Sequence, residues 1–177
     1  MMILVVGMPG SGKDEFIKIG KKLGYNVICM GDIVRNFVKN QGFSLSNEIV
    51  GKIANDEREK HGMDIWAKRT LDSLKNSENI VVDGVRNIEE VELFKRYNIH
   101  IKLIGVHSSP EIRFERLKKR ARKDDIFSKK EFLERDEREL GWGLEKVLDK
   151  CEYIVTNEET LEEYSEKVKD LLEKLFF

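Results

Sequence analysis

Short runs of apolar residues alternate along the chain with longer stretches in which apolar positions recur at helical spacing. The short runs are rich in valine and isoleucine and nearly continuous in hydrophobicity, which is typical of strands buried on both faces of a parallel sheet. The alternation of strands and helices predicts a doubly wound α/β domain with a five-stranded parallel sheet. The predicted strands are Ile3–Val6, Asn26–Met30, Ile80–Asp83, Ile101–His107 and Tyr153–Thr156.

Local signals mark where several of the intervening helices begin. Ser109 followed by Pro110 is typical of an N-cap and a first helical residue, and predicts a helix that continues to Arg122. The segments 128–131 and 160–163 have the pattern of capping boxes. The last helix should bury one face, which consists of Leu161, Tyr164, Val168, Leu171, Leu172 and Leu175.

Two segments interrupt the simple alternation. Residues 32–75 form a long, predominantly helical insertion between the second and third strands, and residues 120–143 form a charged excursion between the fourth and fifth. No linker rich in proline, glycine or serine separates them, so we expect a single domain over residues 1–177. Both insertions should lie over the carboxyl edge of the sheet, where open α/β sheets bind ligands.

Positive and negative charges almost cancel, since 32 Lys and Arg face 33 Asp and Glu, for a formal net charge of −1. This balance argues against a broad nucleic-acid-binding surface. No apolar stretch approaches the roughly 18 residues of a membrane span, and the apolar run 1–6 is too short for a signal sequence. We therefore expect a cytoplasmic protein with neither a membrane nor a nucleic acid as partner.

The remaining composition refines this picture slightly. Cys29 and Cys151 are far apart in the sequence, in apolar surroundings and without a Cys/His cluster, which predicts buried, reduced thiols and argues against a structural zinc site. Gln41 is the only glutamine in a chain rich in lysine and glutamate, a composition reported for hyperthermophile proteins.

A glycine-rich loop between the first strand and the first helix carries the clearest chemical signal. Its pattern is G-x-x-x-x-G-K, in which glycines let backbone N–H groups turn inward around phosphate oxygens and the lysine reaches the β and γ phosphates. We therefore expect ATP to bind here. The residues expected to contact it are Gly7, Met8, Pro9, Gly10, Ser11, Gly12, Lys13 and Asp14.

The position after the lysine departs from this motif. Asp14 stands where a serine or threonine usually supplies a hydroxyl group to magnesium. A carboxylate can also ligate Mg²⁺, directly or through water, so Asp14 is one candidate metal ligand. Alternatively, Asp14 only stabilises the first turn through the helix dipole. The sequence favours neither interpretation.

Four segments, in the same order, resemble adenylate kinases and related nucleoside monophosphate kinases. The loop Gly7–Lys13 resembles their G-x-P-G-x-G-K motif, and the segment 30–35, Met-Gly-Asp-Ile-Val-Arg, resembles T-G-D-M-L-R. Residues 83–86, Asp-Gly-Val-Arg, resemble D-G-F-P-R with one residue fewer, and residues 122–125, Arg-Lys-Asp-Asp, resemble the R-K-D-D segment of the lid. As a whole, the chain is most similar to an archaeal family of adenylate-kinase-related P-loop proteins.

This resemblance implies an ATP-dependent kinase of the P-loop NTPase fold that uses Mg²⁺ and a small phosphate acceptor such as a nucleoside monophosphate. Residues 32–75 would bind the acceptor and residues 120–143 would form the lid. Arg35 and Arg86 would hold the acceptor phosphate, with Asp32 beside them, and Arg122 would reach the transferred group from the lid. Asp83 would orient the metal, and Lys13, Asp83, Arg86 and Arg122 would form the catalytic set.

Further arginines admit two interpretations. Arg113, Arg116 and Arg120 recur on one helix face, which fits a solvated basic stripe, although Arg116 and Arg120 could contact ATP or the lid. Arg135 resembles a second lid arginine at a different spacing, and Arg138 faces the same way. Asp32 could be a simple N-cap.

Two other functions stay open at this point. The segment 30–35 and the segment Tyr153–Asn157 also resemble dephospho-coenzyme A kinases, whose acceptor is a sugar hydroxyl, so Asp32 would be the base and Asn157 would lie by the adenine. Some adenylate-kinase-like proteins instead act as ATPases in RNA processing, which the balanced charge does not support. Lone His107 is more typical of a structural residue, and Trp66 and Trp142 are more typical of packing, although Trp142 could mark a lid hinge.

Overall fold

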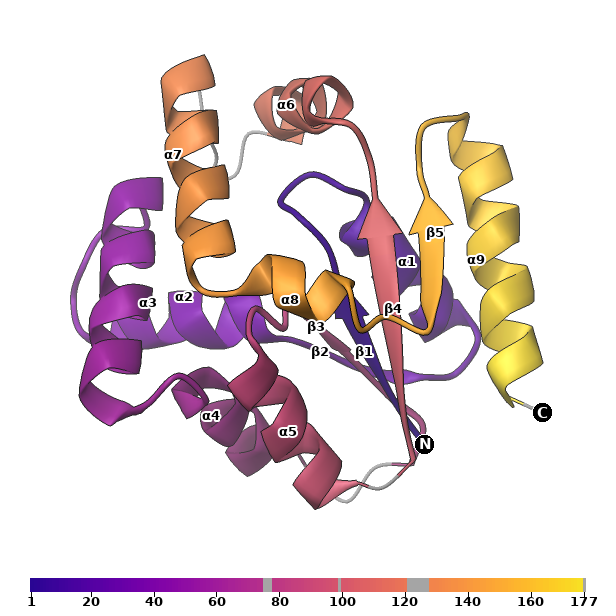
Figure 1. Ribbon diagram of the computed structural model, residues 1–177, viewed down its shortest axis with the longest axis horizontal. Helices are drawn as coiled ribbons and strands as arrows, with labels where there is room; N and C mark the ends of the chain where they lie inside the picture. The colour runs from indigo at the N-terminus through magenta and orange to yellow at the C-terminus, as the bar shows by residue number, and fades with distance from the viewer. Residues whose placement is uncertain (75–77, 99, 121–127, 177) are drawn as a thin grey trace.

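The computed structural model describes residues 1–74, 78–98, 100–120 and 128–176, with the side chain of residue 176 left aside. Its centre is a five-stranded sheet in the order β2-β3-β1-β4-β5, with every neighbouring pair parallel (Figure 1). This confirms the predicted α/β fold with a parallel sheet. The strands are β1 (Met2–Val6), β2 (Asn26–Cys29), β3 (Ile80–Asp83), β4 (Ile101–His107) and β5 (Tyr153–Thr156).

The helices fill the segments in which the sequence predicts them. They are α1 (Lys13–Lys22), α2 (Met30–Asn40), α3 (Asn47–His61), α4 (Ile65–Ser73), α5 (Ile88–Tyr97), α6 (Pro110–Arg120), α7 (Lys129–Gly141), α8 (Leu144–Leu148) and α9 (Leu161–Phe176). The predicted second strand is one residue too long, because Met30 already begins α2. The predicted end of the helix from Pro110 falls on Arg122, which lies outside the described residues.

Two apolar layers sandwich the sheet, and β1 contributes to both because successive side chains of a strand point to opposite faces. Ile3 and Val5 pack with α1 and α9, whereas Met2, Leu4 and Val6 pack with α4, α5 and α8. All five side chains of β1 are completely buried. The strand that carries the phosphate loop is therefore held from both sides.

The predicted helix starts and the predicted apolar face of α9 agree with the structure except at one position. Ser128 and Glu131 form a reciprocal capping box, and Thr160 and Glu163 make the same pair of hydrogen bonds. Tyr164, Val168 and Leu172 are completely buried and Leu171 and Leu175 pack beside them, but Leu161 is exposed. The thiols of Cys29 and Cys151 are free, as expected, but half-buried rather than buried.

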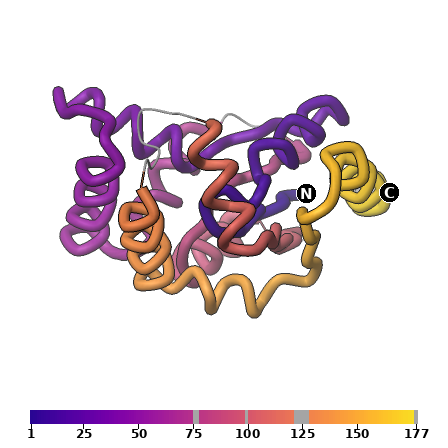
Figure 2. The backbone as a smooth tube through the Cα atoms, turned by 90° about the horizontal axis from the view of Figure 1, so that it is seen from above, coloured from indigo at the N-terminus to yellow at the C-terminus, as the bar shows by residue number. Residues whose placement is uncertain are grey.

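The helices over the carboxyl edge of the sheet come from both insertions. Helices α2 and α3 of the first insertion and α7 of the second lie there, whereas α4 of the first insertion packs on a face of the sheet with Met2, Leu4 and Val6. Seen from above, α7 lies between α3 and α6, and α6 crosses the carboxyl end of the sheet beside the loop that follows β1 (Figure 2). Phe114 and Leu117 of α6 pack against Phe132 of α7, which fixes the two helices to each other. Among the described residues, no helix is long and apolar enough to cross a membrane.

Candidate active site

The loop between β1 and α1 needs glycine at two positions for reasons of space as well as conformation. Gly10 and Gly12 have φ values of 80° and 109°, in the left-handed region that other residues rarely adopt. A Cβ atom on Gly12 would lie 1.9 Å from Nδ2 of Asn157. Because Asn157 follows β5, the loop packs directly against a residue at the end of the edge strand, on the same carboxyl edge of the sheet.

Lys13 is buried in the first turn of α1 and turns back over the loop. Its Nζ atom donates hydrogen bonds to the carbonyl oxygens of Gly7, at 2.7 Å, and Met8, at 3.0 Å. Burial lowers the pKa of Lys13 to about 8, although the negative charge of Asp83 opposes this shift. The protonation of Lys13 therefore depends on the charge beside it, and a bound anion would raise its pKa.

Asp83 and Cys29 meet at the carboxyl edge because β2 and β3 pair in register at these two residues. The thiol of Cys29 donates to Oδ2 of Asp83 over 3.4 Å, and burial raises the pKa of that thiol to about 12, so it stays protonated and able to donate. The other oxygen, Oδ1 of Asp83, is buried and has no hydrogen-bond partner among the described residues.

This lone carboxylate oxygen fits a magnesium site. Nucleotide-bound Mg²⁺ keeps several waters and uses one or two carboxylates together with the phosphates, so it needs no large cluster of protein ligands. The part of the chain that the structure describes holds no group of three or more His, Cys, Asp or Glu side chains placed to bind one metal ion together. Asp14, the other candidate, lies 2.9 Å from Nη1 of Arg120 in an ion pair. Asp83 is therefore the better placed of the two.

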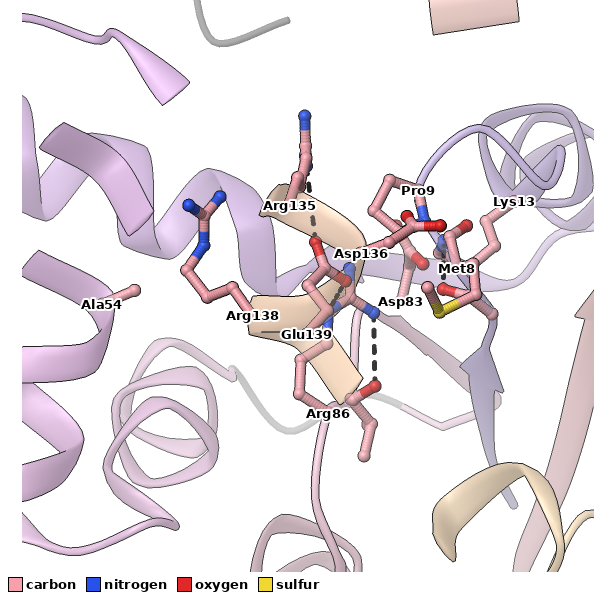
Figure 3. Close-up of polar contacts among 12 residues, drawn as sticks. Met8, Pro9, Lys13, Ala54, Asp83, Arg86, Arg135, Asp136, Arg138 and Glu139 are labelled. Atoms are coloured by element: carbon pink, nitrogen blue, oxygen red, sulfur yellow. Dashed lines mark hydrogen bonds and ion pairs between the residues drawn. The ribbon is translucent and has the colours of Figure 1, made fainter. Parts of the chain in front are cut away.

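Helix α7 brings a buried carboxylate, that of Glu139, to the region around Lys13 and Asp83. Oε2 of Glu139 lies 2.7 Å from Nε of Arg86, and Oε1 lies 3.4 Å from Nε of Arg135 (Figure 3). Burial alone would raise the pKa of Glu139, but Arg86, Arg135 and Lys13 outweigh it and hold the pKa below its usual value. Glu139 is thus a fixed negative charge between two arginines.

The backbone of Arg86 is held by a second buried carboxylate. Oε2 of Glu90, in the first turn of α5, accepts a hydrogen bond from the backbone N–H of Arg86 at 2.7 Å, and its Oε1 pairs with Arg58 of α3 at 3.0 Å. The side chain of Asn87 caps α5 by accepting from the backbone N–H of Glu90. The turn after β3 is therefore rigidly attached to α3 and α5.

Arg113 of α6 ties the phosphate loop to α7. It is buried, pairs with both oxygens of Asp136 at 2.9 and 2.5 Å, and donates to the carbonyl oxygen of Pro9 at 3.1 Å. The interpretation of α6 as a solvated basic stripe is therefore wrong for this residue. Its neighbours are engaged too, since Arg120 pairs with Asp14 and Arg116 donates to Asn157.

A pocket of about 260 Å³ lies on the outer side of the loop. Arg116 donates to the backbone and side-chain oxygens of Asn157 at 3.1 and 3.0 Å, and Ser108 bridges Asn157 to the loop through hydrogen bonds to the carbonyl oxygens of Asn157 and Ser11. The exposed Leu161 lines this pocket, which gives its exposure a structural context. Gly10, Gly12, Asp14, Glu15, Leu117 and Arg120 complete the lining.

A second cavity, of about 140 Å³, opens on the inner side of the loop. Loop residues and Asp83 line one end, α2, α3 and α7 line the rest, and positive charge dominates the lining. Its basic side chains are Lys13, Arg35, Arg58, Arg86, Arg120, Arg135 and Arg138. The two pockets share Gly10, Asp14 and Arg120, so they meet at the phosphate loop.

The residues predicted for catalysis, acceptor binding and metal binding separate into three groups. Lys13, Arg35, Asp83 and Arg86 line the inner cavity together with Asp14. Asp32 is absent from that lining, and its side chain is 65% exposed and paired with Arg35 at 2.6 Å. Arg122 and the segment 122–125 lie outside the described residues.

The structure also bears on two further predictions, the N-cap role of Asp32 and the packing role of Trp142. Asp32 is not an N-cap, because α2 begins at Met30 and Cys29 occupies the capping position. Trp142 packs as expected: its indole N–H donates to Asn55 at 3.0 Å and Arg58 lies 4.2 Å from its ring centre.

Sequence reasoning missed Cys29, Arg58 and Glu139 as parts of the cavity. Glu139 follows Arg135 at i,i+4, a spacing that fits an ordinary surface ion pair, so nothing in the local pattern distinguishes its burial. Cys29 did carry a signal, because it ends a predicted strand at the carboxyl edge that also carries Asp83.

The sheet order, the phosphate loop after β1 and the helices over the carboxyl edge define a P-loop kinase fold. Shikimate kinase from Bacteroides thetaiotaomicron superimposes with a TM-score of 0.68 over 100% of this chain and 99% of that one, at 18% identity. A gluconokinase from Sinorhizobium meliloti gives a TM-score of 0.56 over 98% and 92%, at 19% identity. At these identities the likeness concerns the fold alone.

Sequence relatives identify the family. The AAA domain model AAA_18 matches residues 3–140. A UPF0200 protein of Thermoplasma acidophilum is 41% identical over 175 residues, which cover 99% of this chain and 97% of the relative. A UPF0200 protein of Hyperthermus butylicus is 38% identical over 177 residues, with 99% and 95% covered. The chain therefore belongs to the UPF0200 family, which confirms the expected archaeal P-loop family.

Proposed function

We propose that this protein is an ATP-dependent kinase that transfers the γ-phosphoryl group to the phosphate of a small acceptor, with nucleoside monophosphates as the first candidates. One observation carries the proposal. The phosphate loop lies between an outer pocket and an inner cavity, and arginines from α2, from the turn after β3 and from α7 line the inner cavity. ATP would bind across the loop from the outer pocket, and the acceptor would occupy the inner cavity.

The outer pocket suits the nucleoside part of ATP. Arg116 presents a planar guanidinium group held in place by Asn157, and Leu161 offers an exposed apolar surface beside it. Guanidinium groups and apolar side chains both pack against the faces of flat rings. This supports the expectation that Asn157 lies near the adenine, with Arg116 as its neighbour.

The inner cavity suits a negatively charged acceptor. Phosphoryl transfer spreads charge over the equatorial oxygens, so catalysis depends mainly on positioning and on fixed positive charge. Arg86 and Arg135 converge on Glu139, and Lys13 contributes to the charge around the same carboxylate. These groups would draw the two phosphates together, Asp83 would hold the waters of Mg²⁺, and the metal would neutralise charge on the transferred group.

Transfer to a hydroxyl group is the less supported alternative. A hydroxyl acceptor needs a base within hydrogen-bond reach. Asp32, the residue proposed for that role, is largely exposed, paired with Arg35 and outside the cavity lining. A phosphate acceptor is already ionised and needs no base, which agrees better with this arrangement.

A screen of the purified protein with γ-labelled ATP and Mg²⁺ tests the proposal. The acceptors are the four common ribonucleoside monophosphates and dephospho-coenzyme A, each compared with a reaction that lacks acceptor. We expect label to move to at least one monophosphate. Transfer to dephospho-coenzyme A alone would establish the hydroxyl alternative, and ATP hydrolysis that no acceptor changes would support the helper-ATPase function instead.

A further inference from the structure

Arg138 of α7 differs from the other arginines of the inner cavity in what its guanidinium group contacts. Nη2 donates to Oδ1 of Asn47 on α3 at 2.9 Å, and the group lies 5.9 Å from the centre of the Trp142 ring. Nε is buried and has no hydrogen-bond partner in the described part of the chain. Figure 3 shows Arg138 leaving α7 on the side of Ala54, whereas Glu139 turns toward Arg86.

The other cavity arginines all lie against carboxylates. Arg35 pairs with Asp32, Arg58 with Glu90, Arg120 with Asp14, and Arg86 and Arg135 with Glu139. Within residues 1–74, 78–98, 100–120 and 128–176, no carboxylate lies within ion-pair distance of Arg138. Burial lowers the pKa of Arg138, although the more distant charges of Glu139 and Glu134 act in the opposite direction.

Helix α3 makes room for this guanidinium group at a glycine. A Cβ atom on Gly51 would lie 2.4 Å from Cζ and 2.6 Å from Nε of Arg138. Glycine in a helix interior is less favourable than alanine, so α3 loses some stability at the point where Arg138 rests. Gly51, Asn47 and Arg138 all line the cavity, which makes this contact one of its walls.

We propose that Arg138, supported by Asn47 and Gly51, binds an oxyanion of the acceptor, either a phosphate or a carboxylate group. A buried guanidinium N–H without an acceptor is unfavourable, and a charged oxygen satisfies it more strongly than a neutral one does. The planar fork of arginine matches the geometry of both oxyanions. The inference rests on the proposed function, because it assigns this end of the cavity to the acceptor rather than to ATP.

Calorimetric titration of the full-length protein tests this role. Inorganic phosphate and malonate are the two probes, one for each oxyanion. Each is added with and without a saturating non-hydrolysable ATP analogue and Mg²⁺, because the analogue occupies the phosphate loop. We expect Arg138→Gln to weaken binding of at least one probe about tenfold and to leave analogue affinity unchanged. Arg96→Gln, which removes the same charge from an exposed position on α5, is the matched control.

A second variant, at Gly51, keeps the positive charge of Arg138 but displaces its guanidinium group. Gly51→Ala should fold, since alanine favours the helix and the long side chain of Arg138 can shift. It should nevertheless weaken the binding of the same probe that Arg138→Gln weakens. Weakening of phosphate alone assigns a phosphate group, and weakening of malonate alone assigns a carboxylate.

Unchanged binding of both probes in Arg138→Gln, or no measurable binding of either to the native protein, overturns the inference. Failure of the ATP analogue to bind the native protein instead contradicts the proposed function. If the analogue does not bind, probe titrations without it still test Arg138. The native protein and Arg138→Gln have the same phosphate loop, so any difference in probe binding between them comes from residue 138.

Discussion

Nε of Arg86 lies 2.7 Å from Oε2 of Glu139, and this ion pair joins the turn after β3 to helix α7. Glu139 is buried and also faces Arg135. Glu139→Gln should therefore lower the free energy of unfolding by about 3 kcal/mol or more, because it leaves two half-buried arginines without their counter-charge. Urea denaturation measures this loss. Glu134→Gln, an exposed change on the same helix, should cost less than about 0.5 kcal/mol.

Acid provides an independent check on this pair. The pKa of Glu139 is lower in the folded protein than its ordinary value of 4.5, so its contribution to stability is present above pH 4.5 and disappears as the pH falls through the lower, folded value. The stability difference between the native protein and Glu139→Gln should therefore shrink in acid. A difference that stays constant down to pH 3 would contradict the ion pair as its source.

Lys13 should couple nucleotide binding to proton uptake. Its pKa is lowered to about 8 by burial, and the phosphates of ATP would raise it again. Near pH 8, binding should take up a fraction of a proton, and the affinity for ATP should fall as the pH rises from 7 to 9. Calorimetry in buffers of different ionisation enthalpy measures the uptake directly. A binding enthalpy that does not depend on the buffer at pH 8 would exclude this linkage.

Asp83→Asn should lower phosphoryl transfer at least a hundredfold and raise the Mg²⁺ concentration needed for half-maximal rate. The reason is that Oδ1 of Asp83 is a buried carboxylate oxygen at the end of the cavity, without a hydrogen-bond partner among the residues that the structure describes. Thermal unfolding of the variant shows whether it folds. Asp72→Asn, an exposed change on α4, should leave both quantities unchanged. Equal Mg²⁺ dependence in Asp83→Asn and the native protein would remove Asp83 from the metal site.

Gly12→Ala should abolish nucleotide binding because its Cβ atom would fall 1.9 Å from Nδ2 of Asn157 and force the loop open. The matched control is Gly24→Ala. Gly24 has a similar positive φ of 88° but no atom within 4 Å of the added Cβ, so this variant shares the backbone strain without the collision. Equilibrium dialysis with labelled ATP compares the two. Similar losses in both variants would indicate that strain rather than space is responsible.

Asp32→Asn distinguishes the two acceptor chemistries. Transfer to a phosphate should fall less than tenfold, because the carboxylate of Asp32 only pairs with Arg35 at the cavity rim. Transfer to a hydroxyl group would be lost, since general base catalysis contributes a hundredfold or more. Single-turnover rates with labelled ATP and the acceptor found in the screen give the answer. A large loss with a monophosphate acceptor would show that Asp32 does more than pair with Arg35.

Much of the fold was predictable because its strands are short, apolar and separated by clear helix signals. Three strands have the predicted bounds, and the other two, β1 and β2, differ by one residue. The error at Met30 has a physical cause. Its side chain is buried and apolar, which fits a strand and a helix start equally well, and only the immediate turn into α2 decides between them.

The site was predictable where strand ends converge and less so where helices meet across the cavity. Lys13 follows the loop that begins at the end of β1, and Asp83 ends β3. These two strands are paired neighbours in the sheet, so sequence order almost fixes the proximity of the two residues. Arg113 and Glu139 lie on charged helices that look solvated in sequence. Their burial depends on how α6 and α7 pack over the loop, and no local pattern records that packing.

The central position of β1 has a consequence for how the protein is made. Its partners β3 and β4 come much later in the chain than β1 itself, and so do the helices α4, α5, α8 and α9 that bury its side chains on the two faces of the sheet. Pairings between distant segments form slowly, and β1 cannot pair until the ribosome has synthesised its partner strands. The phosphate loop therefore cannot take its final shape on the ribosome until β4 has emerged. A nascent chain would acquire the ability to bind a nucleotide only late in its synthesis.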